Sequence, residues 1–172
     1  YEFVELHNSG TFDVPLGWHR FDGIDFTFAG DVVIGPGEFL VLASDNDPDA
    51  FKVRYPGLTV NGWYRGSLSN SGERLALLDA RWRRVVEVDF SDASAWPSLA
   101  DGGGHSLELI DLLGDPGAAS NWRDSSAKAG SPGRASATPV VPPVRINEVH
   151  VQSPLSPQPD FVELQNLGEA TV

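Results

Sequence analysis

The acidic residues between Asp45 and Asp49 form the pattern in this sequence that lies closest to a metal site. The run Asp45-Asn-Asp47-Pro-Asp49 has the alternate carboxylates with which calcium-binding loops begin. The pattern fails further on, because Ala50 stands where such loops need glycine and Pro56 where they need a bidentate glutamate. We therefore interpret Asp47 as the N-cap of a short helix near residues 48–55, and we predict no metal.

The other residue types that carry catalysis show no spacing that points to a reaction. The chain has no cysteine, and its histidines (His7, His19, His105 and His150) have no ligand spacing. The glycine run Asp101–Gly104 precedes a predicted strand, whereas phosphate loops precede a helix. No G-x-S-x-G nucleophile elbow occurs. We therefore predict that the protein is not an enzyme and has no catalytic residues and no cofactor.

Aromatic residues in predicted loops are the best candidates for a binding surface. Trp82 falls at the tip of a predicted hairpin between Arg81 and Arg83, and Trp63 and Tyr64 lie in a predicted loop rich in Gly, Ser and Asn. An exposed indole flanked by guanidinium groups can stack on a sugar or anchor a protein partner. The alternative is that these rings cap the ends of the core, as we expect of three other tryptophans, namely Trp18, Trp96 and Trp122.

The charge of the chain argues against two classes of partner. The formal net charge is −12 at pH 7, whereas phosphate backbones and anionic membrane surfaces both attract basic proteins. No apolar run approaches the roughly 18–20 residues that a membrane-spanning helix needs. We therefore predict neither a nucleic-acid partner nor a membrane partner.

The stretch from Leu68 to Phe90 predicts a β-hairpin around which the rest of the chain is arranged. Apolar residues alternate with polar ones on both sides of Asp79–Trp82, with Leu75 and Leu77 before this turn and Val86, Val88 and Phe90 after it. A two-stranded ribbon is not stable alone in water, so further strands must cover its apolar face. With 18 glycines and 13 prolines to form turns, the chain is predicted to be all-β, as a β-sandwich or barrel.

The sequence repeats itself near its C-terminal end. Glu2–Gly10 is similar to Asp160–Gly168, with Phe3 and Phe161 standing 158 positions apart (161 − 3). We predict a first domain over residues 1–134, a Pro/Ala/Ser linker over 135–143, and the opening strands of a second repeat over 144–172. Because the second copy has a strand-like segment ahead of its repeat and the first copy does not, the first domain is predicted to lack its own first strand.

A series of short motifs in one order resembles the bacterial lamin-tail domain. The motifs are Ile146-Asn-Glu-Val, Phe-Val-Glu-Leu-x-Asn, Leu16-Gly-Trp18, Phe26-Thr-Phe28, Gly35-Pro-Gly-Glu-Phe-Leu-Val-Leu42, Gly66–Leu75, Gly104–Asp111 and Asn121-Trp-Arg123. The resemblance implies an immunoglobulin-like β-sandwich. It also implies a bacterial module, secreted or on the cell surface, of the kind found in multidomain proteins beside spore-coat-type kinase domains. This family supplies no catalytic residues.

The missing first strand leads to a hypothesis about assembly. An open sandwich leaves a hydrogen-bonding edge, and the segment from Val144 to Val151 has the chemistry of the strand that would cover it. We expect this strand to pair with the first domain, either by folding back within the chain or by entering a second copy. The alternative is that it pairs only within the second domain. The candidate residues are Val144, Ile146, Asn147, Glu148, Val149 and Val151.

Two functions remain open from the sequence. The first is a non-catalytic structural or interaction module whose partners are other protein domains, or a second copy through strand exchange. The second is a carbohydrate-binding module that uses loop aromatics to hold an attached catalytic domain near a polysaccharide.

Overall fold

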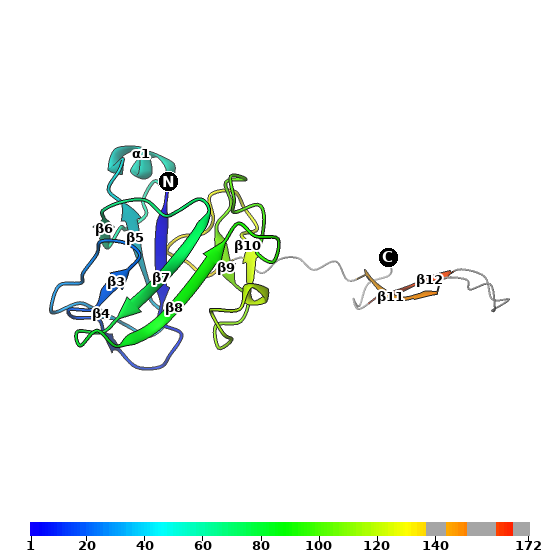
Figure 1. The fold of residues 1–172 in the computed structure, drawn as a ribbon, viewed down its shortest axis with the longest axis horizontal. Helices are drawn as coiled ribbons and strands as arrows, with labels where there is room; N and C mark the ends of the chain where they lie inside the picture. The colour runs from blue at the N-terminus through cyan, green and yellow to red at the C-terminus, as the bar shows by residue number, and fades with distance from the viewer. Residues whose placement is uncertain (137–143, 151–160, 167–172) are drawn as a thin grey trace. The chain divides into compact units, whose positions relative to one another are not determined.

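The computed structural model describes residues 1–136, 144–150 and 161–166. The chain divides into two compact units, Tyr1–Ala137 and Thr138–Val172, and each is described by itself. Strands dominate and only one short α-helix occurs among the described residues, so the predicted all-β class is confirmed (Figure 1). Most of the predicted linker, 137–143, lies outside the described residues, as does Val151.

Unit 1 contains two three-stranded sheets. The first has the order β1-β5-β6 and the second β3-β7-β8. Leu40, Leu42 and Tyr64 of the first sheet join Phe21 and Leu75 of the second in one buried cluster, so the two sheets share a core. The bounds are β1 Phe3–His7, β5 Phe39–Ser44, β6 Gly62–Tyr64, β3 Arg20–Asp22, β7 Gly72–Leu78 and β8 Arg84–Ser91.

Smaller elements complete unit 1. Strand β2 (Val14–Pro15) pairs with β4 (Val33–Ile34), and β9 (Leu107–Leu109) pairs with β10 (Trp122–Asp124) after the 3-10 turn η1 (Ala119–Asn121). The helix α1 spans Pro48–Arg54, as predicted. The Asp47 side chain caps it by accepting a hydrogen bond from the Ala50 backbone at 2.9 Å, and Phe51 anchors it to the core.

The predicted hairpin is confirmed as β7 and β8. They pair antiparallel from Gly72 opposite Ser91 to Leu78 opposite Arg84. Leu75 and Leu77 are buried as predicted. Ala76, predicted to lie on the wet face, is also buried. Alternation alone misses this, because it does not show which positions other segments of the chain cover.

Two other details differ from the prediction. Trp63 and Tyr64 lie not in a loop but in β6, which runs parallel to β5. Trp18, expected in the core, is 61% exposed. Residues 25–28 form only isolated bridges, Thr27 with Arg20 and Asp25 with Arg65. In β9, Glu108 is buried while Leu107 and Leu109 are half-buried, because Ser131 and Arg123 provide polar partners for the carboxylate.

Unit 2 contains an antiparallel pair, β11 (Val144–His150) and β12 (Phe161–Asn166). Val144 stands opposite Asn166 and His150 opposite Phe161, with a register shift between Ile146 and Glu148. This shift leaves Asn147 as an extra residue, a β-bulge. In neither unit do the described residues include a helix that is long and apolar enough to cross a bilayer.

Candidate functional site

One carboxylate fixes the tip of the β7–β8 hairpin. Asp79 Oδ1 accepts hydrogen bonds from the backbone N–H groups of Arg81 and Arg83, each at 2.9 Å. Asp79 Oδ2 also pairs with Arg83 Nε at 2.7 Å. These interactions, led by the Arg83 backbone N–H, lower the pKa of Asp79 below its usual value. The Arg83 side chain is therefore held by Asp79.

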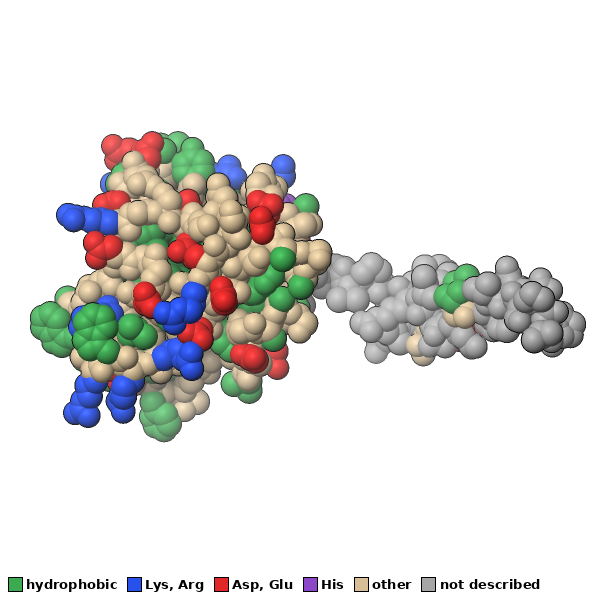
Figure 2. Space-filling view, in the orientation of Figure 1, with side chains coloured by type: hydrophobic (Ala, Val, Ile, Leu, Met, Phe, Trp, Pro, Cys, Tyr) green, Lys and Arg blue, Asp and Glu red, His purple; other side chains and the backbone are tan. Residues whose placement is uncertain are grey.

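Trp82 stands exposed at this tip. Its side chain is 65% exposed, and its backbone φ of 65° lies in the left-handed region that bulky residues rarely adopt. The cation that stacks on the indole is Arg20 of β3, with its guanidinium carbon 3.8 Å from the ring centroid. Figure 2 shows hydrophobic and basic side chains gathered at the end of unit 1 where this turn lies. Trp82 is thus available to a partner, although its cation is not the one expected from the sequence.

The structure removes Tyr64 from the predicted binding surface. Tyr64 is fully buried in the shared core, because β6 pairs beside β5. Trp63 is half-buried. Its ring meets Phe51 edge to face at 5.7 Å, and the Lys52 ammonium lies 5.8 Å from its centroid. Trp63 therefore ties α1 to the sheet and offers only part of its ring to a partner.

Trp18 is an exposed aromatic that sequence reasoning missed. Its φ is 61° and its indole lies against Gly30, where an added Cβ would come within 2.8 Å of the ring. The sequence does not signal this exposure, because tryptophan is highly buried on average. Two exposed tryptophans in left-handed backbone conformations therefore occur in unit 1.

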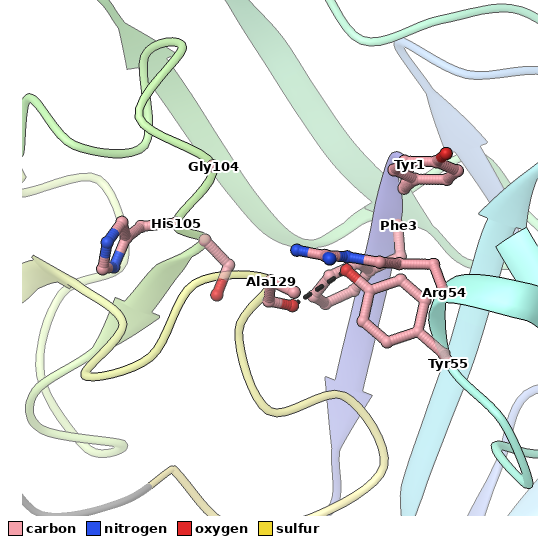
Figure 3. Close-up of a pocket in the computed structure, with 8 residues that line it drawn as sticks. Tyr1, Phe3, Arg54, Tyr55, Gly104, His105 and Ala129 are labelled. Atoms are coloured by element: carbon pink, nitrogen blue, oxygen red, sulfur yellow. Dashed lines mark hydrogen bonds between the residues drawn. The ribbon is translucent and has the colours of Figure 1, made fainter.

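A small cavity lies at the N-terminal end of β1 (Figure 3). It has a volume of about 160 Å³ and is lined by Tyr1, Phe3, Arg54 and Tyr55 together with residues 104–106 and 129. The Tyr55 hydroxyl donates to the Ala129 carbonyl at 2.8 Å, and the His105 ring points away from the cavity. Ligand pockets usually measure about 300–1,000 Å³, so this cavity is too small for most metabolites.

A second cavity, of about 370 Å³, is mostly apolar. It is lined by residues 26–29, 32–33 and 61–62 and by Leu40. Asn61 Oδ1 already accepts a hydrogen bond from the Val41 backbone at 2.8 Å. The cavity therefore lacks the convergent polar groups that orient a substrate. In addition, no group of three or more His, Asp or Glu side chains that could hold a metal occurs in the described part of the chain.

Two acidic residues, Glu5 of β1 and Glu108 of β9, are neighbours. Burial is the main cause that raises the pKa of Glu5 to about 7, and the neighbouring Glu108 raises it further, while the Gly133 N–H lowers it. That N–H donates to Glu5 Oε2 at 2.5 Å. Glu108 in turn accepts from the Ser131 hydroxyl at 3.1 Å. Through these two hydrogen bonds, Glu5 and Glu108 hold the 131–133 segment beside β1. Neither carboxyl lines either cavity.

The outer edge of β1 is the most distinctive feature of unit 1. Strand β1 lies at the end of its sheet and pairs only with β5. Asn8 N–H donates to the Glu38 carbonyl and Ser44 N–H to the Glu2 carbonyl, so the even-numbered residues direct their backbone groups to β5. The backbone groups of Phe3, Glu5 and His7 therefore point outward, and no hydrogen-bond partner for them occurs among the described residues.

In unit 2 the strand equivalent to β1 has a partner. The repeat aligns β1 with β12, and β12 pairs with β11. The predicted complementing residues Val144, Ile146, Asn147, Glu148 and Val149 all lie in β11. The repeated strand therefore occurs twice: β12 pairs with β11, whereas the outer edge of β1 has no partner strand among the described residues.

Comparison with known proteins adds no relative. Neither the protein-family models nor the curated proteins that were searched match this chain.

Proposed function

We propose that this chain is a non-catalytic structural and interaction module of a secreted or cell-surface bacterial protein, and that it associates by adding a strand to its sheet edge. The open outer edge of β1 carries the proposal. The order of the lamin-tail-like motifs supports an immunoglobulin-like sandwich, and two sheets around one core agree with that architecture. The extracellular setting rests on the same resemblance.

The physical basis is the cost of an unpaired edge. A row of outward N–H and C=O groups is a template for another strand, and natural proteins usually cover or blunt it. Extended segments bind such edges through main-chain hydrogen bonds, while pockets for alternate side chains give specificity. An edge such as β1 therefore fits a role in assembly.

Blocking the edge tests the proposal. His7→Pro removes one outward N–H, and by the alternation of β1 it removes no hydrogen bond to β5. His7→Ala is the matched control, because it removes the same side chain and keeps the N–H. We expect the full chain and His7→Ala to gain mass with concentration in light scattering, and His7→Pro to remain a monomer. Equal masses for all three proteins at every concentration would overturn the proposal.

A second candidate function is carbohydrate binding through Trp82. The exposure of this ring and its left-handed backbone favour it, because strained conformations persist where they serve a function. Trp82→Ala should weaken binding to a polysaccharide by about 1–2 kcal/mol if ring stacking matters. Phe12→Ala, which removes a ring that is still more exposed, is the control. Retention on immobilised polysaccharides that does not change in Trp82→Ala would dismiss this function.

A further inference from the structure

We infer that the outer edge of β1 accepts the strand Val144–His150 from a second copy of the chain, antiparallel and in the register that this strand takes on β12. The inference rests on the proposed function and goes further, since it names the occupant and the residue pairs.

The repeat supplies the register. Positions 158 apart are equivalent, so Phe161 of β12 corresponds to Phe3 of β1. On β12, Arg145 stands opposite Gln165 and His150 opposite Phe161. Transferred to β1, Arg145 stands opposite His7 and His150 opposite Phe3. Between them, Ile146, Glu148 and Val149 then face Leu6, Glu5 and Val4.

The bulge at Asn147 makes the side-chain faces match. Ile146 and Val149 are three positions apart, so in a regular strand they would point to opposite faces. The extra residue restores the alternation and assigns both positions to one face, opposite Leu6 and Val4. These two residues of β1 pack against the shared core and are only partly buried. An added β11 strand would therefore place position 146 and Val149 beside that core.

The exposed surface of unit 2 agrees with this role. Val149 is 57% exposed and Val162 is 58% exposed. Pairing on β1 would cover Val149 and would provide acceptors and donors for the outward groups of Phe3, Glu5 and His7. Glu148 would stand opposite Glu5, a like-charge pair that costs some stability. The same opposition, Glu148 against Glu163, already exists in unit 2, so this strand type tolerates it.

A second copy supplies the occupant of the β1 edge through reciprocal exchange. Each chain carries one open β1 edge and one β11 strand, so two copies that exchange their β11 strands form a closed two-fold dimer. The donor loses little, because a two-stranded ribbon such as β11–β12 is marginally stable in water.

Paired cysteines test the register in the full chain. The protein has no cysteine, so His7→Cys with Arg145→Cys introduces the only two thiols. Residues directly opposite on antiparallel strands lie within reach of a disulfide, whereas positions several pairs apart do not. The matched control is His7→Cys with His150→Cys, and each single-cysteine variant measures random cross-linking. The readouts are the mass under denaturing conditions after mild oxidation and its return on reduction.

We expect the His7/Arg145 pair to shift from the mass of one chain to that of two under oxidation, and the control pair and single variants to stay at one. A cross-link within one chain would overturn the second copy as occupant. Equal cross-linking of both pairs, or none, would overturn the register. If none forms while association remains sensitive to His7→Pro, this inference fails and the proposed function stands; if association itself is absent, both fail.

Discussion

At the scale of single residues, Tyr64 places a polar hydroxyl group inside the apolar core. It is fully buried, yet its hydroxyl has no hydrogen-bond partner among the described residues. Burial raises the pKa of this hydroxyl above its usual value, and the nearby carboxylates of Glu2 and Glu73 raise it further. A buried polar group without a partner costs free energy that an apolar ring would avoid.

Tyr64→Phe should therefore leave the free energy of unfolding unchanged or raise it by about 1 kcal/mol. Tyr55→Phe is the control: its hydroxyl bonds to the Ala129 carbonyl at 2.8 Å, and losing that bond should cost about 0.5–1.5 kcal/mol. Chemical denaturation of both variants measures the difference. A loss for Tyr64→Phe as large as for Tyr55→Phe would mean that the buried hydroxyl has a partner.

Glu5 gives unit 1 a dependence on pH. Its pKa is about 7 in the folded protein against an ordinary 4.5, so the folded state binds more protons than the unfolded state between these values. Stability therefore falls as pH rises through this window. Glu5→Gln keeps an acceptor for the Gly133 N–H and cannot ionise, so it should match the wild type at pH 4. At pH 8 it should be more stable by about 1–2 kcal/mol, allowing for partial exposure.

Thermal melts of wild type and Glu5→Gln across this range provide the measurement. The difference between the two proteins is the informative quantity, because other acids titrate in both. A constant difference from pH 4 to 8 would contradict the assignment.

At the scale of elements, the helix α1 depends on its cap more than on its charges. Seven residues are too few to be stable alone, so the Asp47 bond to the Ala50 backbone and the burial of Phe51 must hold it. The ion pair between Asp49 and Lys52, at 3.7 Å, is largely exposed and adds little.

Asp47→Ala should accordingly destabilise unit 1 by about 1 kcal/mol. Asp49→Ala removes the same charge from the same turn and should change stability by less than about 0.5 kcal/mol. Denaturant midpoints compare the two variants directly. Equal losses would indicate that charge at the helix N-terminus, and not the capping bond, stabilises α1.

At the scale of the whole molecule, the net charge of −12 opposes contact between copies. Raising NaCl from about 10 mM to about 100 mM shortens the screening distance from about 30 Å to about 10 Å. Self-association through the β1 edge should therefore tighten with salt. Sedimentation at the two salt concentrations measures the dissociation constant. Weaker association at higher salt would show instead that attraction between opposite charges dominates the contact.

Local patterns in the sequence by themselves determined several elements of this protein. Alternation identified β7 and β8, and the Asp47-Pro48 pair identified the start of α1, because each signal depends on neighbours within a few residues. The repeat of Phe3 at Phe161 likewise came from the sequence alone.

Only the tertiary structure decided which aromatic rings are exposed and which edge is open. Tyr64 is buried because β6 lies beside β5, and Trp18 is exposed because its backbone turns left-handed over Gly30. The bulge at Asn147 likewise comes from pairing between two strands that are separated along the chain. The physical reason is the same in each case: burial, register and edges are set by contacts between segments far apart in the chain, and local periodicity carries no information about which segments meet.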